Sequence, residues 1–113
     1  MTEFISNYLN ENLKCIKEIE ENLIPTIEEV FTKLSIARDN GKNIFIFGNG
    51  GSATTASHFT ADLLKTSLVV NQRKMKVICL CDNISVFSAW ANDMSYEMVF
   101  AKQLENFLQK DDI

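Results

Sequence analysis

The sequence is poor in the residues that interrupt or cross-link a chain. It has one proline, four glycines and three cysteines among 113 residues. Cys15, Cys79 and Cys81 form no C-x-x-C pair and have no histidine at ligand spacing, so we expect neither a disulfide framework nor a cysteine zinc site. The odd number of cysteines, without a signal peptide, indicates a reducing cytoplasm.

Two further absences argue against whole classes of function. The formal net charge is −4, and the charges are spread rather than blocked, which disfavours binding to nucleic acid. No apolar run approaches the roughly 18 residues that a membrane span needs. Apolar residues make up 46% and charged residues 23%, which is typical of a globular domain, and residues 1–113 are enough for one domain.

Apolar spacing predicts two helices in the first 41 residues. The first carries apolar residues three and four positions apart, at Ile5, Leu9, Leu13, Ile16, Ile19 and Leu23. Pro25 fits the first turn of the second helix, and Asn40-Gly41 is typical of a helix C-terminus. The stripe of the first helix is narrow, so it is predicted to cover this chain's own sheet or, equally, to pack against another subunit.

The remaining residues alternate between strand and helix patterns. Short apolar runs predict buried strands, and helical spacing predicts three more helices, the last of them capped by Ser95. The strands are expected at Ile44–Phe47 and Met75–Cys81, and the helices at Ser52–Lys65, Ile84–Trp90 and Ser95–Leu108. This order predicts an α/β fold with a parallel sheet and helical crossovers.

A glycine-rich break joins the first strand to the helix that follows. The first N–H groups of a helix have no intrahelical partner and carry partial positive charge, and glycines let a ligand approach the backbone closely. Asn49 adds an amide and Ser52 a hydroxyl at the same place. The stretch from Gly48 to Ser52 therefore predicts a phosphate site; the alternative is a tight turn that needs glycine for geometry alone.

Two known phosphate motifs fit less well. Gly48 to Ala53 matches the dinucleotide pattern G-x-G-x-x-G/A, but that pattern also needs an acidic residue about 20 positions further on. The second predicted strand ends at Asp82, too far along the chain for that role. The G-K-[ST] ending of a P-loop is absent. A dinucleotide-binding half-domain is therefore a weaker alternative.

Two segments together resemble a known family. FGNGGSATTASHF, followed by AWANDMSYEMVFAKQL, is similar to the SIS (sugar isomerase) domain, and within it to the phosphoheptose isomerase group. The resemblance implies a three-layer fold with a parallel sheet between helices, and a homotetramer with active sites shared between subunits. It covers only the N-terminal part of that domain, with residues 1–41 as a helical arm and 42–113 as the first part of an incomplete sheet.

The resemblance also implies a reaction and binding residues. Members of the group interconvert ketose and aldose phosphates by proton transfer through an enediol. Asn49, Gly50, Gly51 and Ser52 match the group's first sugar-phosphate loop, and Asp93 matches an aspartate that contacts substrate hydroxyls. The implied substrate is a heptose phosphate or a related sugar used for cell-surface polysaccharide such as lipopolysaccharide or capsule.

The implied catalytic residues are His58 and Asp62. Their spacing of four places them on one helical face, where they form a metal pair, an acid–base pair or a solvated hydrogen-bonded pair. The resemblance matches His58 to a histidine that binds zinc in some members, with Asp62 beside it as a second possible zinc ligand. Asp62 stands where the group has a glutamate as catalytic base, and a base must come within about 3 Å of its proton.

The shorter side chain of Asp62 keeps a second function open. Some members of the family lack the glutamate and act as non-catalytic phosphosugar-binding proteins or oligomeric adaptors. In the group, a second phosphate loop with the pattern S-x-S-G-N-S follows the next strand, and this pattern does not occur before Ile113. We therefore expect isomerase activity from a full-length chain and none from residues 1–113 alone.

Overall fold

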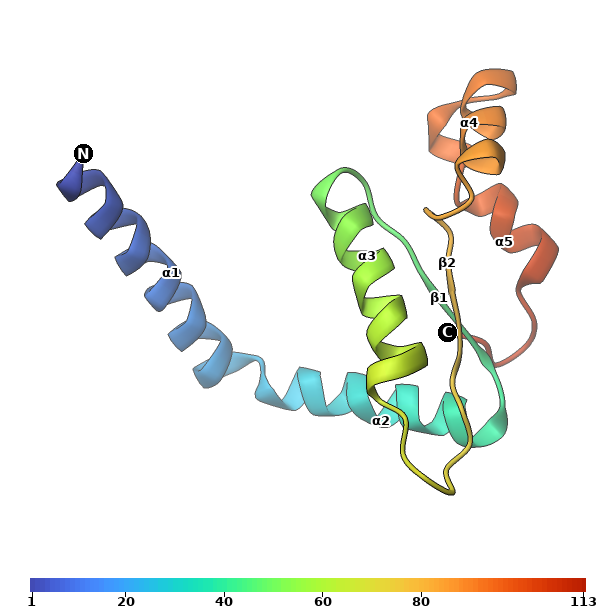
Figure 1. Cartoon of the computed structure of the whole chain (residues 1–113), viewed down its shortest axis with the longest axis horizontal. Helices are drawn as coiled ribbons and strands as arrows, with labels where there is room; N and C mark the ends of the chain where they lie inside the picture. The colour runs from blue at the N-terminus through green and yellow to red at the C-terminus, as the bar shows by residue number, and fades with distance from the viewer. The chain divides into compact units, whose positions relative to one another are not determined.

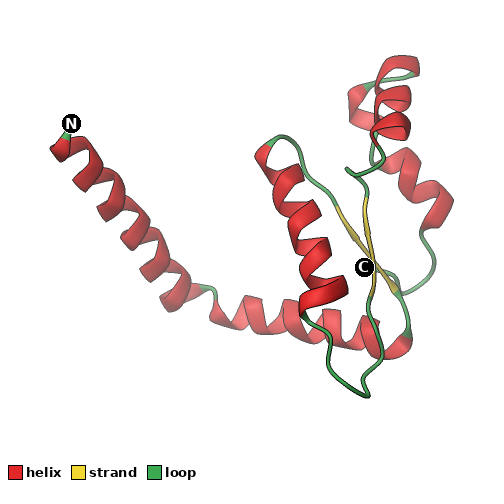
Figure 2. Ribbon diagram, in the orientation of Figure 1, coloured by secondary structure: helices red, strands yellow, loops and turns green.

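The computed structural model describes all residues from Met1 to Ile113 (Figures 1 and 2). It divides into two compact units, Met1–Lys33 and Leu34–Ile113. In chain order the regular elements are α1 (Thr2–Asn22), α2 (Ile24–Asn40), β1 (Asn43–Ile46), α3 (Gly51–Ala61), the π-helical turn η1 (Asp62–Thr66), β2 (Lys76–Cys79), α4 (Ile84–Asp93), the 3₁₀ turn η2 (Tyr96–Met98) and α5 (Ala101–Phe107).

The two N-terminal helices form as their sequence predicts. α1 buries none of its side chains, and its apolar stripe is exposed along its whole length, from Ile5 to Leu23. α2 begins at Ile24 with Pro25 in its first turn and ends before Gly41, whose φ of 65° is the left-handed conformation that glycine adopts most readily. No helix of the chain is long and apolar enough to cross a membrane.

The second unit contains a parallel sheet, which confirms the predicted fold class. β1 and β2 pair in parallel register, with Ile44 opposite Val77 and Ile46 opposite Cys79. The chain between them runs through α3, so the crossover is helical as expected. Figure 1 draws α3 and α5 on opposite sides of the two strands, which is the layering of an α/β domain.

One face of the sheet carries the main apolar cluster. On this face, Ile44 and Val77 pack with Ala37 of α2 and Leu63 of η1. Because side chains alternate along a strand, Phe45 projects from the opposite face. The chain continues from β2 into Leu80, which is 1% exposed.

α5 is fastened to the end of β2 by a buried side chain. Gln103 is 3% exposed, and its Nε2 donates to the carbonyl oxygens of Leu80 at 3.0 Å and Val99 at 2.9 Å. A buried amide without partners would destabilise the fold, so these two bonds fix where α5 begins relative to the sheet.

The helix predicted from Ser95 to Leu108 is interrupted. Ser95 does stand at an N-cap position, but of a 3₁₀ turn rather than of a long helix, and its side chain makes no capping hydrogen bond. A 3₁₀ turn follows, and α5 begins only at Ala101. The turn buries Val99 to 1% exposure and leaves Tyr96 pointing at the glycine loop, and these tertiary contacts outweigh local helix propensity.

The helix predicted from Ser52 to Lys65 also changes form. α3 ends at Ala61, and the turn that follows is closed by a bond from the Ser67 N–H to the Asp62 carbonyl oxygen at 2.9 Å, five residues apart. A π turn rotates the side chains after it relative to a continued α-helix. Within the turn, Leu63 is buried and Asp62 is partly exposed.

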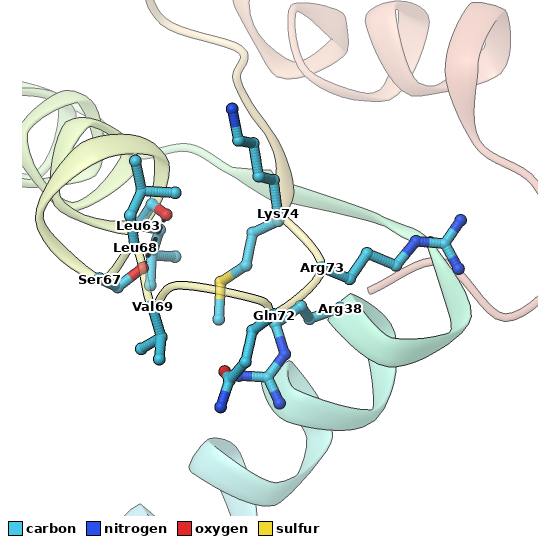
Figure 3. Close-up of a pocket in the computed structure, with 9 residues that line it drawn as sticks. Arg38, Leu63, Ser67, Leu68, Val69, Gln72, Arg73 and Lys74 are labelled. Atoms are coloured by element: carbon cyan, nitrogen blue, oxygen red, sulfur yellow. Dashed lines mark hydrogen bonds between the residues drawn. The ribbon is translucent and has the colours of Figure 1, made fainter.

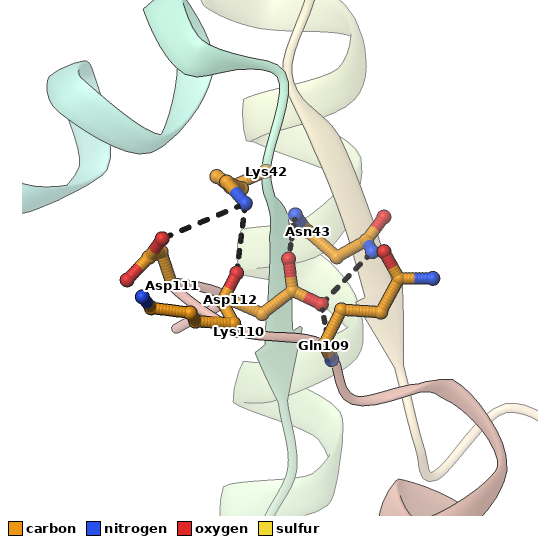
Figure 4. A network of polar contacts seen from close by, with 6 residues as sticks. All are labelled: Lys42, Asn43, Gln109, Lys110, Asp111 and Asp112. Carbon is orange, nitrogen blue, oxygen red and sulfur yellow. Dashed lines mark hydrogen bonds and ion pairs between the residues drawn. The ribbon is translucent and has the colours of Figure 1, made fainter.

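The last residues pair with the edge of β1 that β2 leaves free. The Ile113 N–H donates to the Asn43 carbonyl oxygen at 3.0 Å, and the Phe45 N–H donates to the Ile113 carbonyl oxygen at 2.8 Å, which is the pattern of a parallel ladder. Asp112 accepts from the Asn43 main-chain N–H at 2.8 Å and from its side-chain amide at 3.0 Å (Figure 4). The hydrogen bonds from Asn43 lower the pKa of Asp112.

Candidate functional site

The glycine loop between β1 and α3 needs glycine at two positions. A Cβ at Gly48 would lie 2.7 Å from the carbonyl carbon of Ser52, so no larger residue allows the end of β1 to lie this close to the first turn of α3. Gly50 has φ 56° and ψ −123°, a conformation that costs an L side chain free energy. Gly51 has neither constraint.

The loop leaves a run of backbone donors free at the start of α3. The N–H groups of Asn49, Gly50 and Gly51 donate no hydrogen bond within the chain. The Ser52 N–H instead donates to the Asn49 carbonyl oxygen at 3.0 Å, and the Ala53 N–H donates to the Gly50 carbonyl oxygen at 3.1 Å. Gly51 and Ser52 do stand at the helix N-terminus, as predicted, but the Ser52 N–H is used inside the loop. Three consecutive free N–H groups with the helix dipole behind them attract an anion.

A cavity of about 360 Å³ opens beside the loop. Its polar side is the loop itself, and its apolar side comes from α4, η2 and the end of β2. The lining residues are Gly48, Asn49, Gly50, Ala53, Cys81, Ile84, Phe87 and Tyr96. A hollow of this size with a few convergent polar groups and aromatic walls is typical of a small-molecule site.

Two side chains from distant parts of the sequence contact the glycine loop, and the sequence alone does not predict these contacts. The Tyr96 hydroxyl donates to Asn49 Oδ1 at 2.8 Å, across 47 positions of sequence. Cys81 Sγ donates to the Gly48 carbonyl oxygen at 3.2 Å and accepts from the Gly48 N–H at 3.4 Å. Cys79 is buried, and burial raises the pKa of its thiol. Cys81 is half-buried and holds the loop.

His58 and Asp62 meet on α3, as their spacing predicts. His58 Nε2 lies 3.6 Å from Asp62 Oδ2, and their side chains are 81% and 48% exposed. The Thr66 hydroxyl donates to Asp62 Oδ1 at 3.1 Å, so the π turn supplies a partner that the sequence did not suggest. The pair lines a second, open hollow of about 450 Å³ with Phe59, Thr54 and Thr55.

The geometry of the pair is compatible with two zinc ligands. Bonds of about 2.0–2.1 Å at a tetrahedral angle place two ligand atoms about 3.3 Å apart, close to the observed 3.6 Å between His58 Nε2 and Asp62 Oδ2. A catalytic zinc takes at least three protein ligands. The chain has no group of three or more histidine, cysteine, aspartate or glutamate side chains placed to hold a metal. His58 and Asp62 therefore fit as two ligands of a zinc site that needs at least one further ligand from outside residues 1–113.

The structure separates the predicted site residues into groups. Asn49 and Gly50 line the cavity at the loop, whereas His58 and Asp62 line the other hollow. Along α3, the pair stands about 10–16 Å beyond Gly51, at 1.5 Å per residue. Asp93 ends α4 and accepts from the Asn92 side-chain amide at 2.9 Å without lining either hollow. The contact of Asp93 with substrate hydroxyls therefore stays a prediction.

The basic residues before β2 hold the crossover rather than a ligand. Arg73 Nη1 donates to the Asp39 carbonyl oxygen at 3.1 Å. Arg38 Nη1 donates to Gln72 Oε1 at 2.9 Å, and both of these residues line the pocket drawn in Figure 3. The cavity among them is about 10 Å³, room for about one water. A sugar phosphate does not fit there.

Comparison with known proteins places these features in a family. Residues 7–113 match the SIS domain. A phosphoheptose isomerase of Geotalea daltonii is 32% identical over 113 residues, which is 100% of this chain and 58% of that protein. The lincomycin biosynthesis protein LmbN of Streptomyces lincolnensis is 55% identical over 62 residues, covering 55% of this chain and 22% of that protein.

A solved structure agrees over nearly the whole chain. The structure of a phosphoheptose isomerase from Francisella tularensis superposes with a TM-score of 0.90 at 25% identity, covering 98% of this chain and 58% of that one. The chain therefore spans little more than half the length of these isomerases. The parallel sheet, the glycine loop and the match over residues 7–113 together show that the chain belongs to the SIS domain family.

Proposed function

We propose that the whole protein is an aldose–ketose isomerase of a phosphorylated sugar, with a heptose phosphate as the first substrate to test. One observation carries the proposal: the N–H groups of Asn49, Gly50 and Gly51 are free at the start of α3, and the turns that follow carry an exposed histidine–carboxylate pair. Similarity to phosphoheptose isomerases over the full chain supports the choice of substrate.

The loop would bind the charged end of the substrate. A phosphate oxygen accepts from the free N–H groups, and the Ser52 hydroxyl and Asn49 amide add side-chain donors. One helix N-terminus contributes about 0.3–1 kcal/mol, and up to about 2 in a partly buried geometry. Micromolar affinity needs about 8 kcal/mol, so further groups must contribute. For this reason we propose that residues 1–113 alone have no isomerase activity.

The pair on α3 would move the protons. Asp62 takes the proton from the carbon next to the sugar carbonyl and returns it to the former carbonyl carbon. His58 gives a proton to the carbonyl oxygen as the enediol forms, and takes the proton of the neighbouring hydroxyl as the new carbonyl forms. Thr66 holds the Asp62 carboxylate. His58 and Asp62 would be two of the ligands of a zinc ion, which would supply Lewis-acid chemistry to the sugar oxygens. The shorter side chain of Asp62 requires the substrate to approach α3 more closely than a glutamate would.

The proposed enzyme is a homotetramer in the cytoplasm. The exposed apolar stripe of α1, with Ile5, Leu9 and Ile16 between 50% and 60% exposed, supports packing between subunits. A sugar phosphate carries almost two negative charges and does not cross a bilayer unaided, which supports a cytoplasmic site. Size-exclusion chromatography with light scattering on the whole protein tests the oligomer.

The decisive experiment is a coupled assay of the whole protein with sedoheptulose 7-phosphate. Asp62→Asn should lower kcat about 10²–10⁴-fold, because the amide cannot accept the proton, while the dissociation constant changes little. Glu11→Gln, which removes an exposed carboxylate from α1, is the matched control. Equal turnover by wild type and Asp62→Asn removes Asp62 from the mechanism. Binding without turnover in the wild type favours the alternative, a phosphosugar-binding adaptor.

A further inference from the structure

The Asn49 side chain is held by a residue far along the chain. The Tyr96 hydroxyl donates to Asn49 Oδ1 at 2.8 Å, and both residues line the cavity at the glycine loop. Of the loop residues that line this cavity, Asn49 alone has a polar side chain, and its backbone N–H donates no hydrogen bond within the chain. Whatever fixes its amide therefore fixes what the loop presents to a ligand.

The direction of this hydrogen bond decides whether Asn49 offers an acceptor or donors to a ligand. A primary amide has an acceptor oxygen and an NH₂ group with two donors. The Tyr96 hydroxyl donates to Asn49 Oδ1. The Asn49 Nδ2 donates no hydrogen bond within the chain, so it is available to a ligand. An anion beside the loop is repelled by an amide oxygen and bound by the NH₂ group.

Tyr96 is 52% exposed, and its ring packs on one side against other aromatic residues. Its ring packs edge-on against Phe87, with centroids 5.7 Å apart and planes at 80°. Phe87 also contacts Phe100, which stacks at 4.7 Å on Phe47, the residue before Gly48. These rings connect the phenol to the strand end that enters the glycine loop, and they place the hydroxyl within hydrogen-bond distance of Asn49.

We propose that Tyr96 is a positioning residue of the phosphosugar site: it binds the Asn49 amide oxygen and so turns the amide NH₂ toward the phosphate or a hydroxyl of the ligand. The inference rests on the proposed function for the identity of the ligand. It does not depend on turnover, because it concerns which atom of Asn49 faces the cavity.

A double-mutant cycle on the whole protein tests the role. Tyr96→Phe keeps the ring against Phe87 and removes the hydroxyl; it should raise the dissociation constant of sedoheptulose 7-phosphate about threefold to tenfold, with a smaller change in kcat. Asn49→Ala should weaken binding at least as much, and the double variant no more than Asn49→Ala. Tyr8→Phe on α1 is the matched control and should bind like the wild type. Additive effects, or unchanged binding by Tyr96→Phe, overturn the proposal.

Asn49→Asp tests the direction of the amide separately. The carboxylate still accepts from Tyr96 but turns a charged oxygen toward the ligand, so binding should fall at least 100-fold. Retained binding shows that the NH₂ group does not face the ligand. If the wild type binds no phosphorylated sugar, the proposed substrate fails. The NMR signal of the Asn49 side-chain amide, titrated with inorganic phosphate in wild type and Tyr96→Phe, then decides the inference: a shift in the wild type that is lost in the variant supports it, and equal responses refute it.

Discussion

The glycine loop and the His58–Asp62 pair stand on the same helix but are assembled differently. The loop is held by groups 33 and 47 positions away in sequence, Cys81 and Tyr96. The pair is held by its own helix, through spacings of four residues to each side of Asp62. Substitutions in the loop should therefore act on both folding and binding, whereas those at the pair should act on chemistry alone.

The largest effect is expected at Gly48, where the loop depends most on close packing. Gly48→Ala places a Cβ 2.7 Å from backbone atoms of Ser52, and relieving this clash should lower the free energy of unfolding by about 1–3 kcal/mol. Phosphosugar binding should weaken at least tenfold, measured by calorimetry beside a thermal unfolding curve. Gly51→Ala is the control for stability alone, because nothing in the chain lies within 4 Å of its Cβ. Equal effects of the two substitutions on stability contradict the packing argument.

Thr66 gives the matching test at the pair. Thr66→Val removes the hydroxyl that donates to Asp62 Oδ1, and kcat should fall roughly threefold to tenfold with little change in binding or stability. Thr32→Val is the control, since the Thr32 hydroxyl donates to the Glu28 carbonyl oxygen within α2. A large loss of stability in Thr66→Val means that the pair, like the loop, contributes to folding.

A smaller effect is expected at Cys81. Cys81→Ala removes a weak donor and acceptor from both sides of the Gly48 peptide, so phosphosugar binding should weaken roughly twofold to threefold. Cys15→Ala, at an exposed position of α1, should bind normally. Binding that is unchanged in Cys81→Ala shows that the loop keeps its shape without the thiol.

The smallest effect is a pH dependence at the other end of β1. Hydrogen bonds from Asn43 lower the pKa of Asp112, so the carboxylate stabilises the fold at neutral pH. That contribution is lost as the pH falls through the lowered pKa, below the value of about 3.9 for a free aspartate. Asp112→Asn should have a lower melting temperature than the wild type at pH 7, and its melting temperature should fall less as the pH is lowered. An unaltered acid dependence of the melting temperature assigns the effect to other carboxylates.

Much of the fold follows from local sequence. The helical spacing of α1, the strand patterns of β1 and β2, and the glycines that end α2 and begin α3 depend on residues near one another, so their pattern predicts the structure. Gly48 and Gly50 were recognisable for the same reason. The contact between His58 and Asp62 also follows from a spacing of four on one helix.

Tertiary structure decided what these elements bring together. The π turn at Asp62, the extended Ser95 and the 3₁₀ turn that carries Tyr96 each depend on burying residues such as Leu63 and Val99 in a core built from distant strands. A one-dimensional pattern contains no distance between Tyr96 and Asn49. Only packing against the parallel sheet sets that distance, because it fixes the η2 turn and the glycine loop on the same edge.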